Sequence, residues 1–148
     1  MKSWSNISGI PDREPDEINQ YETKIWKLDK SGNYIVMFDK YGDRYWYLDG
    51  RRHREDGPAV EFANGQKEWF LNGERHREDG PAVEWIDGSK SWYRNGKYHR
   101  ENGPAIEYLD GPKEWYLNGK KIKPKDYSSP QRWQKLVELE RIRQVMED

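Results

Sequence analysis

All three histidines of the chain stand at one repeated position. His53, His76 and His99 are 23 residues apart, and each is followed by Arg-Glu-Asp or Arg-Glu-Asn. Imidazole and carboxylate groups can together bind a metal ion or transfer protons. If each repeat adds two strands, however, equivalent residues lie about 9 to 10 Å apart, whereas nitrogen ligands bond Zn²⁺ at about 2.0 to 2.1 Å. This spacing argues against a shared metal ion.

A catalytic site needs one unique constellation, and this chain carries three copies of the same one. We therefore predict that the histidines are structural and bond the backbone near the Gly-Pro turns. We expect no metal, no cofactor and no enzymatic activity. The sequence also lacks a Gly-rich phosphate loop, a serine elbow and a His-Glu-x-x-His zinc motif.

A row of arginines accompanies the histidines. The row consists of Arg54, Arg77 and Arg100, each followed by a glutamate, namely Glu55, Glu78 and Glu101. One interpretation is a solvated face on which the charges neutralise each other, because exposed ion pairs contribute little stability. The other is a line of guanidiniums that grips phosphates or carboxylates of a partner. The residues alone leave both interpretations open.

The elements that position these side chains form a tandem repeat. Tryptophans recur every 23 residues, at Trp46, Trp69, Trp92 and Trp115, and glycines follow the same period. Short aromatic-rich segments alternate with Asn-Gly, Gly-Pro and Asp-Gly turns, which favour hairpins. The sequence predicts a mainly β fold, an elongated single-layer array of 23-residue hairpin units over residues 42–123, with strands of about three to five residues.

The aromatic strand of each unit alternates between two faces. Trp69 and Leu71 point one way, and Phe70 points the other way. The equivalents of Phe70 in the four units are Tyr47, Phe70, Tyr93 and Tyr116. If the tryptophan face makes the core, these four side chains form an exposed stripe that binds a partner. If the array covers both of its faces, they are structural.

Different segments close the two ends of the array. Residues 1–20 are polar and interrupted by prolines, which indicates a flexible arm unless Trp4 and Ile10 dock. Residues 21–41 predict a degenerate hairpin that caps the first unit, because an uncovered sheet edge aggregates. Within residues 124–148, Ser129 as N-cap and Pro130 as first helical residue predict a helix.

Apolar residues of this predicted helix recur at helical spacing, at Trp133, Leu136, Leu139, Ile142 and Met146, where the helix is expected to end. The simpler interpretation is a capping helix whose apolar face packs on the last hairpin. The alternative is a helix that binds a partner or a second copy of the chain. Val137 lies off the main stripe.

The repeat resembles a known family. The residues that carry the likeness are Gly65, Trp69, Asn72-Gly73, His76, Gly80 and Trp85-Ile86-Asp87-Gly88. They are similar to the MORN repeat, although this chain lacks the glycine that follows the histidine there. The chain looks like a variant with Trp-Tyr-Leu-Asn-Gly and His-Arg-Glu-Asp-Gly-Pro-Ala repeats, as in bacterial and bacteriophage proteins. The resemblance implies a run of hairpins that presents aromatic and charged ladders to a protein or lipid partner.

Composition limits the classes of partner and the cellular location that we expect. The 26 basic and 27 acidic side chains give a net charge of -1, so no overall field attracts nucleic acid. The chain has no cysteine, no signal-peptide run and no stretch of about 20 apolar residues, so we expect a cytoplasmic protein without a membrane span.

We predict a non-enzymatic scaffold that binds another protein through its aromatic and Arg/Glu ladders. By the resemblance, it would be an inhibitor or adaptor encoded by a bacteriophage or bacterium. The alternative is binding of an anionic ligand, such as nucleic acid, a nucleotide or a phospholipid headgroup, at the arginine row. A homo-oligomer joined through the C-terminal helix is a further expectation.

Overall fold

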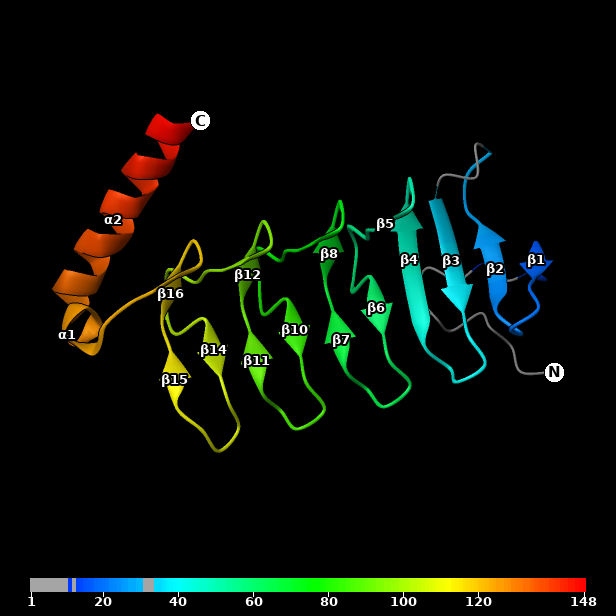
Figure 1. Ribbon diagram of the computed structural model, residues 1–148, viewed down its shortest axis with the longest axis horizontal. Helices are drawn as coiled ribbons and strands as arrows, with labels where there is room; N and C mark the ends of the chain where they lie inside the picture. Colours follow the sequence, from blue (N-terminus) through cyan, green and yellow to red (C-terminus); the bar gives the residue numbers. More distant parts are fainter. Residues whose placement is uncertain (1–10, 12, 31–33) are drawn as a thin grey trace.

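The structure is an elongated row of β-hairpins with a helix at one end (Figure 1). It is a computed structural model, and it describes residues 11, 13–30 and 34–148. The described residues form 17 short strands, two helices and one long antiparallel sheet with side branches. The predicted fold class, a mainly β hairpin array with an N-terminal hairpin and a C-terminal helix, is confirmed.

The longest strands lie at the N-terminal end. They are β2 (Lys24–Lys27), β3 (Tyr34–Phe38) and β4 (Arg44–Leu48), preceded by the short β1 (Glu17–Ile18). β2 and β3 form the predicted capping hairpin, and β3 pairs with β4 along its whole length. β1 lies in the predicted N-terminal arm and pairs with β2. The backbone before β1 is also held, since Trp26 Nε1 donates to the carbonyl of Arg13 at 3.0 Å. The remainder of the arm, residues 1–10 and 12, lies outside the described residues.

From residue 51 onward each strand is two residues long. The members of the main sheet are β6 (Val60–Glu61), β7 (Lys67–Glu68), β10 (Val83–Glu84), β11 (Lys90–Ser91), β14 (Ile106–Glu107) and β15 (Lys113–Glu114). The others are β5 (Arg51–Arg52), β8 (Phe70–Leu71), β9 (Glu74–Arg75), β12 (Tyr93–Arg94), β13 (Lys97–Tyr98), β16 (Tyr116–Leu117) and β17 (Lys120–Lys121). The main sheet runs β1-β2-β3-β4-β6-β7-β10-β11-β14-β15, with β5 branching from β4. Separate two-stranded ribbons are formed by β8 with β9, β12 with β13, and β16 with β17.

After β4, which is continuous through Trp46, the strands are shorter than predicted because each later aromatic strand divides at its tryptophan, at Trp69, Trp92 and Trp115. Before Trp69, β7 pairs with β6 and β10, and after it β8 pairs with β9. The Trp69 N–H donates to the carbonyl of Ala82 at 2.8 Å, and its carbonyl accepts from the N–H of His76 at 3.1 Å. The tryptophan is therefore the branch point at which the chain leaves the main sheet for a hairpin of its own.

The predicted Asn-Gly turns are present. Asn72 has φ 51° and Gly73 has φ 87°, the pair of positive values that a tight two-residue hairpin turn requires. Asn95 and Asn118 have the same conformation, each followed by a glycine with positive φ. These turns set the register of the short ribbons.

The core is thin and divided into three clusters along the row. The N-terminal cluster contains Trp26, Val36, Trp46, Ala59, Val60 and Phe70. The middle cluster contains Ala82, Val83 and Tyr93, and the C-terminal cluster contains Leu117, Ile122, Trp133 and Val137. Each unit buries little by itself, so its stability depends on its neighbours.

Two helices, α1 (Pro124–Tyr127) and α2 (Pro130–Glu147), close the C-terminal end. The predicted start of α2 is confirmed, since the Ser129 hydroxyl accepts from the N–H of Arg132 at 3.2 Å and Pro130 opens the helix. The predicted buried stripe is wrong in its second half. Leu139, Ile142 and Met146 are exposed, whereas Val137 is buried with Trp133.

The described residues contain no helix with both the length and the apolar character that crossing a membrane requires.

Candidate functional site

The arginine row lies flat on the tryptophan row. The guanidinium carbons of Arg54, Arg77 and Arg100 lie 4.1, 3.9 and 3.7 Å from the ring centroids of Trp46, Trp69 and Trp92. Each arginine also closes its own loop. Arg77 donates to Asp79 at 2.9 Å, to the carbonyl of Pro81 at 3.0 Å and to Glu84 at 3.0 Å. These contacts explain the Gly-Pro step, because a Cβ at Gly80 would stand 2.9 Å from the guanidinium carbon.

This arrangement turns carboxylates, rather than guanidiniums, toward the solvent. The side chains of Arg54 and Arg77 are 2% and 22% exposed, whereas those of their partners Asp56 and Asp79 are 73% and 86% exposed. Arg100 follows the same pattern at 21% exposed. The row is therefore neither the freely solvated face nor the open line of guanidiniums that the sequence suggested.

The histidines join each unit to the next. The Nδ1 atoms of His53, His76 and His99 accept the backbone N–H groups of Asn72, Asn95 and Asn118 at 3.0, 3.1 and 3.0 Å. A structural role is what the sequence predicted, but the bonded backbone is in the Asn-Gly turn of the following unit and not in the Gly-Pro turn. The other ring nitrogen of His76, Nε2, lies 2.8 Å from a carboxylate oxygen of Glu78.

The aromatic side chains Tyr47, Phe70, Tyr93 and Tyr116 do not form an exposed stripe. Phe70 and Tyr93 are buried, and the two outer tyrosines are half-buried. The returning ribbon strands cover them: Arg75 lies over the rings of Phe70 and Tyr93, each at 5.6 Å. Tyr98 also stacks against Tyr93, with ring centroids 4.3 Å apart. Both faces of the aromatic strand are therefore covered by the array itself.

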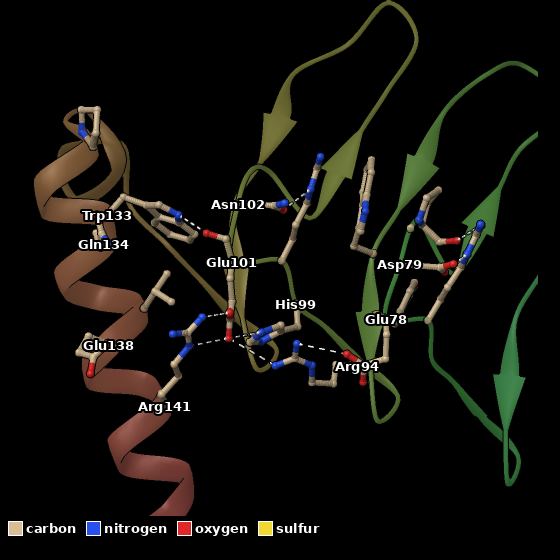
Figure 2. A pocket seen from close by; sticks show the side chains of 18 residues that line it. Glu78, Asp79, Arg94, His99, Glu101, Asn102, Trp133, Gln134, Glu138 and Arg141 are labelled. Carbon is tan, nitrogen blue, oxygen red and sulfur yellow. Dashed lines mark hydrogen bonds and ion pairs between the residues drawn. The ribbon is translucent and has the colours of Figure 1, made fainter.

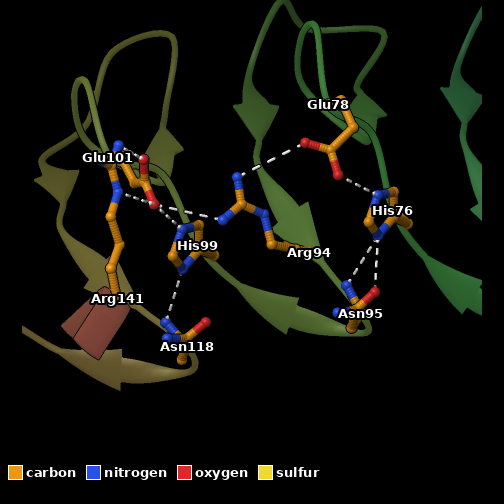
Figure 3. A network of polar contacts seen from close by, with 8 residues as sticks. All are labelled: His76, Glu78, Arg94, Asn95, His99, Glu101, Asn118 and Arg141. Atoms are coloured by element: carbon orange, nitrogen blue, oxygen red, sulfur yellow. Dashed lines mark hydrogen bonds and ion pairs between the residues drawn. The ribbon is translucent and has the colours of Figure 1, made fainter. Parts of the chain in front are cut away.

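A polar network, which we define as His76, Glu78, Arg94, His99, Glu101 and Arg141, crosses from the middle units to α2 (Figure 3). Arg94 bridges two units, with its guanidinium 3.6 Å from Glu78 and 3.4 Å from Glu101. Arg141 of α2 donates to the same Glu101 carboxylate at 2.5 Å. That hydrogen bond lowers the pKa of Glu101 to about 2.

Sequence reasoning missed Arg94 and Arg141 as members of this network. Arg94 did carry a signal, because the equivalent position in the other units is a leucine, at Leu48, Leu71 and Leu117. Arg141 carried none, since only the fold brings it to a residue 40 positions earlier.

A groove of about 840 Å³ lies between the polar network and α2 (Figure 2). Trp133 forms part of its wall, and the ring nitrogen donates to the carbonyl of Glu101 at 2.5 Å. The charged groups in the wall pair with each other, as Arg141 does with Glu101. The described lining contains no serine, threonine or lysine that could serve as a nucleophile beside His99. The groove is therefore a polar crevice in which four arginines face four acidic side chains.

A second surface lies on two turns of the main sheet, the one that joins β10 to β11 and the one that joins β14 to β15. Four large apolar side chains are exposed there, Trp85 at 42%, Ile86 at 66%, Tyr108 at 44% and Leu109 at 62%. We call these four residues the tip patch. The two tips touch, because the N–H of Leu109 donates to the hydroxyl of Ser89 at 3.1 Å.

The tip patch departs from the repeat. At the position of Ile86 and Leu109, the two preceding tips carry Lys40 and Ala63. The apolar character therefore increases toward the C-terminal units, although the turns share one backbone plan. Sequence reasoning named Trp85 and Ile86 only for the family likeness and did not predict a binding role for the tip patch, yet its departure from the period was visible.

No group of three or more histidine, cysteine or acidic side chains is placed to hold a metal ion in the part of the chain that the structure describes. Comparisons with protein-family models, with curated proteins and with solved structures find no match to this chain. The likeness to MORN repeats remains a resemblance of residues.

Proposed function

We propose that the protein is a non-enzymatic scaffold that binds another protein through the tip patch. The observation that carries the proposal is the exposure of Trp85, Ile86, Tyr108 and Leu109 on two touching turns. Contiguous exposed apolar side chains mark interaction surfaces in soluble proteins. Tryptophan and tyrosine are also among the residues that contribute most to binding energy.

The repeated aromatic and arginine ladders support this assignment because their side chains already contact other parts of the array. Phe70 and Tyr93 are buried between strands, and the Arg77 guanidinium is bonded to its own loop. Residues that repeat in every unit thus hold the units together, whereas the tip residues that differ between units remain available. We therefore place recognition at the tips and not at the ladders from which the sequence predicted it.

An anionic ligand at the arginine row is the weaker candidate. To reach Arg77, an anion would have to replace the hydrogen bonds that it donates to Asp79 and Glu84. It would also approach past carboxylates, since the side chain of Asp79 is 86% exposed. Both effects oppose binding of a phosphate.

The test is capture of partner proteins on the immobilised chain, washed at low and at high salt. Wild type is compared with the double variant Ile86→Asp, Leu109→Asp. The matched control is Lys40→Asp, which places the same side chain at the equivalent position of an earlier tip. We expect one set of partners on wild type and control that persists at high salt and is absent from the double variant.

Equal capture by the double variant would contradict the tip assignment. Capture that is lost in high salt and in Arg77→Ala, but not in the tip variant, would favour the anionic-ligand alternative.

A further inference from the structure

The last strand of the main sheet pairs on one side only among the residues that the structure describes, and we call its other side the free edge. β15 stands at the end of the strand order and pairs with β14. The equivalent strands of earlier units pair on both sides, β7 with β6 and β10, and β11 with β10 and β14. In Figure 1, β15 ends the row, and the chain beyond it turns away toward α1 and α2.

The chain after β15 completes the internal contacts of the last unit. Tyr127 of α1 stacks on the ring of Trp115 at 4.7 Å, the role that Arg100 plays for Trp92. The N–H of Ile122 donates to the carbonyl of Trp115 at 2.8 Å, as the N–H of His99 does to Trp92. What a following unit gives each earlier one, a strand beside its main-sheet strand, the described residues do not place beside β15.

The interior junctions show which strand belongs there. At each junction an apolar β-branched residue and a glutamate lie antiparallel to the preceding strand: Val60-Glu61 on Tyr45-Arg44, Val83-Glu84 on Glu68-Lys67, and Ile106-Glu107 on Ser91-Lys90. The glutamate faces a basic residue every time. Because opposite charges on facing strands attract, this pairing selects the register.

The alanine that precedes each of these pairs completes the junction. The carbonyls of Ala59, Ala82 and Ala105 accept the N–H groups of Trp46, Trp69 and Trp92, each at 2.8 Å. By the same geometry, a strand on β15 would accept the N–H of Trp115. It would place an apolar residue opposite Glu114 and an acidic residue opposite Lys113, which is exposed.

We propose that the free edge of β15 binds an extended segment of a partner protein by strand addition. The segment runs antiparallel to β15 and carries, in order, a small residue, a β-branched apolar residue and an acid, as in Ala-Val-Glu. Main-chain hydrogen bonds provide the attachment, and the acid opposite Lys113 provides the register. The site is independent of the tip patch.

The probe is a synthetic peptide with the sequence of residues 78–91 of this chain, which contains Ala82, Val83 and Glu84. Binding to the full chain is followed by fluorescence anisotropy, and amide hydrogen exchange is followed by NMR. We expect exchange of the Trp115 amide to slow on binding. The Trp92 amide, already bonded to Ala105 at 2.8 Å, serves as the internal control and stays unchanged.

A charge exchange tests the register. Lys113→Glu is expected to weaken binding of this peptide about threefold to fivefold, and a peptide with Glu84→Lys is expected to regain that loss on the variant. Circular dichroism checks that the variant keeps its fold.

Four results would overturn the proposal. The first is an unchanged Trp115 amide at millimolar peptide, and the second is equal affinity of Lys113→Glu for both peptides. The third is loss of peptide binding in Ile86→Asp, Leu109→Asp, which would move the contact to the tip patch. Self-association of the chain that blocks the peptide would identify a second copy as the occupant and would also overturn it.

Discussion

Consecutive units and the C-terminal cap are attached to the array by different kinds of contact. Between units the contacts are polar and repeat, as in the hydrogen bond from the N–H of Asn95 to His76. At the C-terminal end the histidine position holds Ile122, which is buried with Leu117, Trp133 and Val137. The polar ladder thus gives way to an apolar cluster where the repeat ends.

The difference follows from what each neighbour can offer. A following unit presents a backbone N–H at the same place every 23 residues, so one histidine geometry serves each junction. A helix has no free backbone N–H along its side, because its amides bond within the helix. The cap must therefore be held by burial of apolar area, with Arg141 and Trp133 anchoring it on Glu101.

Among the variants that test this difference between units and cap, the largest loss of stability is expected from Trp133→Ala. The side chain is buried, packs edge-on against Trp115 and donates to the carbonyl of Glu101. Its loss should destabilise the attachment of α2 by about 3 to 5 kcal/mol, while the hairpin array stays folded. Hydrogen exchange of α2 amides compared with strand amides measures this, with the exposed Trp85→Ala as control. Equal destabilisation of strands and helix would show that cap and array are one cooperative unit.

The next effect concerns an interior contact. His99→Ala removes the acceptor of the Asn118 N–H and should lower the free energy of unfolding by about 1 to 3 kcal/mol. His76→Ala should cost less, because the same bond at Asn95 lies in an exposed position. Urea denaturation of both variants provides the measurement. A larger loss of stability for His76→Ala would mean that solvent exposure does not determine how much each histidine hydrogen bond contributes.

The pH dependence of stability should reveal the same histidine. Burial, aided by the nearby charge of Arg94, lowers the pKa of His99 below its ordinary value of 6.5. The unfolded chain therefore binds more protons between these two pKa values, so stability is present above about pH 6.5 and is lost as the pH falls toward the folded pKa. Urea midpoints measured between neutral and mildly acidic pH test this. His99→Gln should flatten the dependence, and an unchanged slope would assign it to another group.

The smallest effect is expected from Arg141→Ala at the cap. Its side chain is 58% exposed, so we expect only a small change in the free energy of unfolding. The pKa of Glu101 should rise from about 2 toward its ordinary value of 4.5. The loss of stability as the pH falls from 4.5 to about 2 should therefore be smaller in the variant. NMR titration of the carboxylate measures this. Arg143→Ala, which removes an exposed arginine of the same helix, is the control, and an unmoved Glu101 would assign its low pKa to Arg94.

Local signals were predictive wherever the conformation depends on neighbours in the sequence. The Asn-Gly turns and the Ser129 cap of α2 were found in this way. Positive φ favours asparagine and glycine, and the unpaired N–H groups of a first helical turn favour a side chain such as serine that accepts a hydrogen bond. The buried face of α2 was not predictable, since Val137 and Leu139 are equally apolar. Val137 is the buried one because it packs in the cluster that contains Leu117 and Ile122 of the last hairpin.

The sequence by itself determined the period, the turns and the branch tryptophans, because each repeats a local requirement in every unit. Only the tertiary structure decided which repeated side chains remain available. Phe70 and Arg77 are covered by neighbours, whereas Ile86 and the edge of β15 are not. Accessibility depends on how units stack and where stacking stops. The tips and the final edge are therefore the surfaces at which we propose recognition.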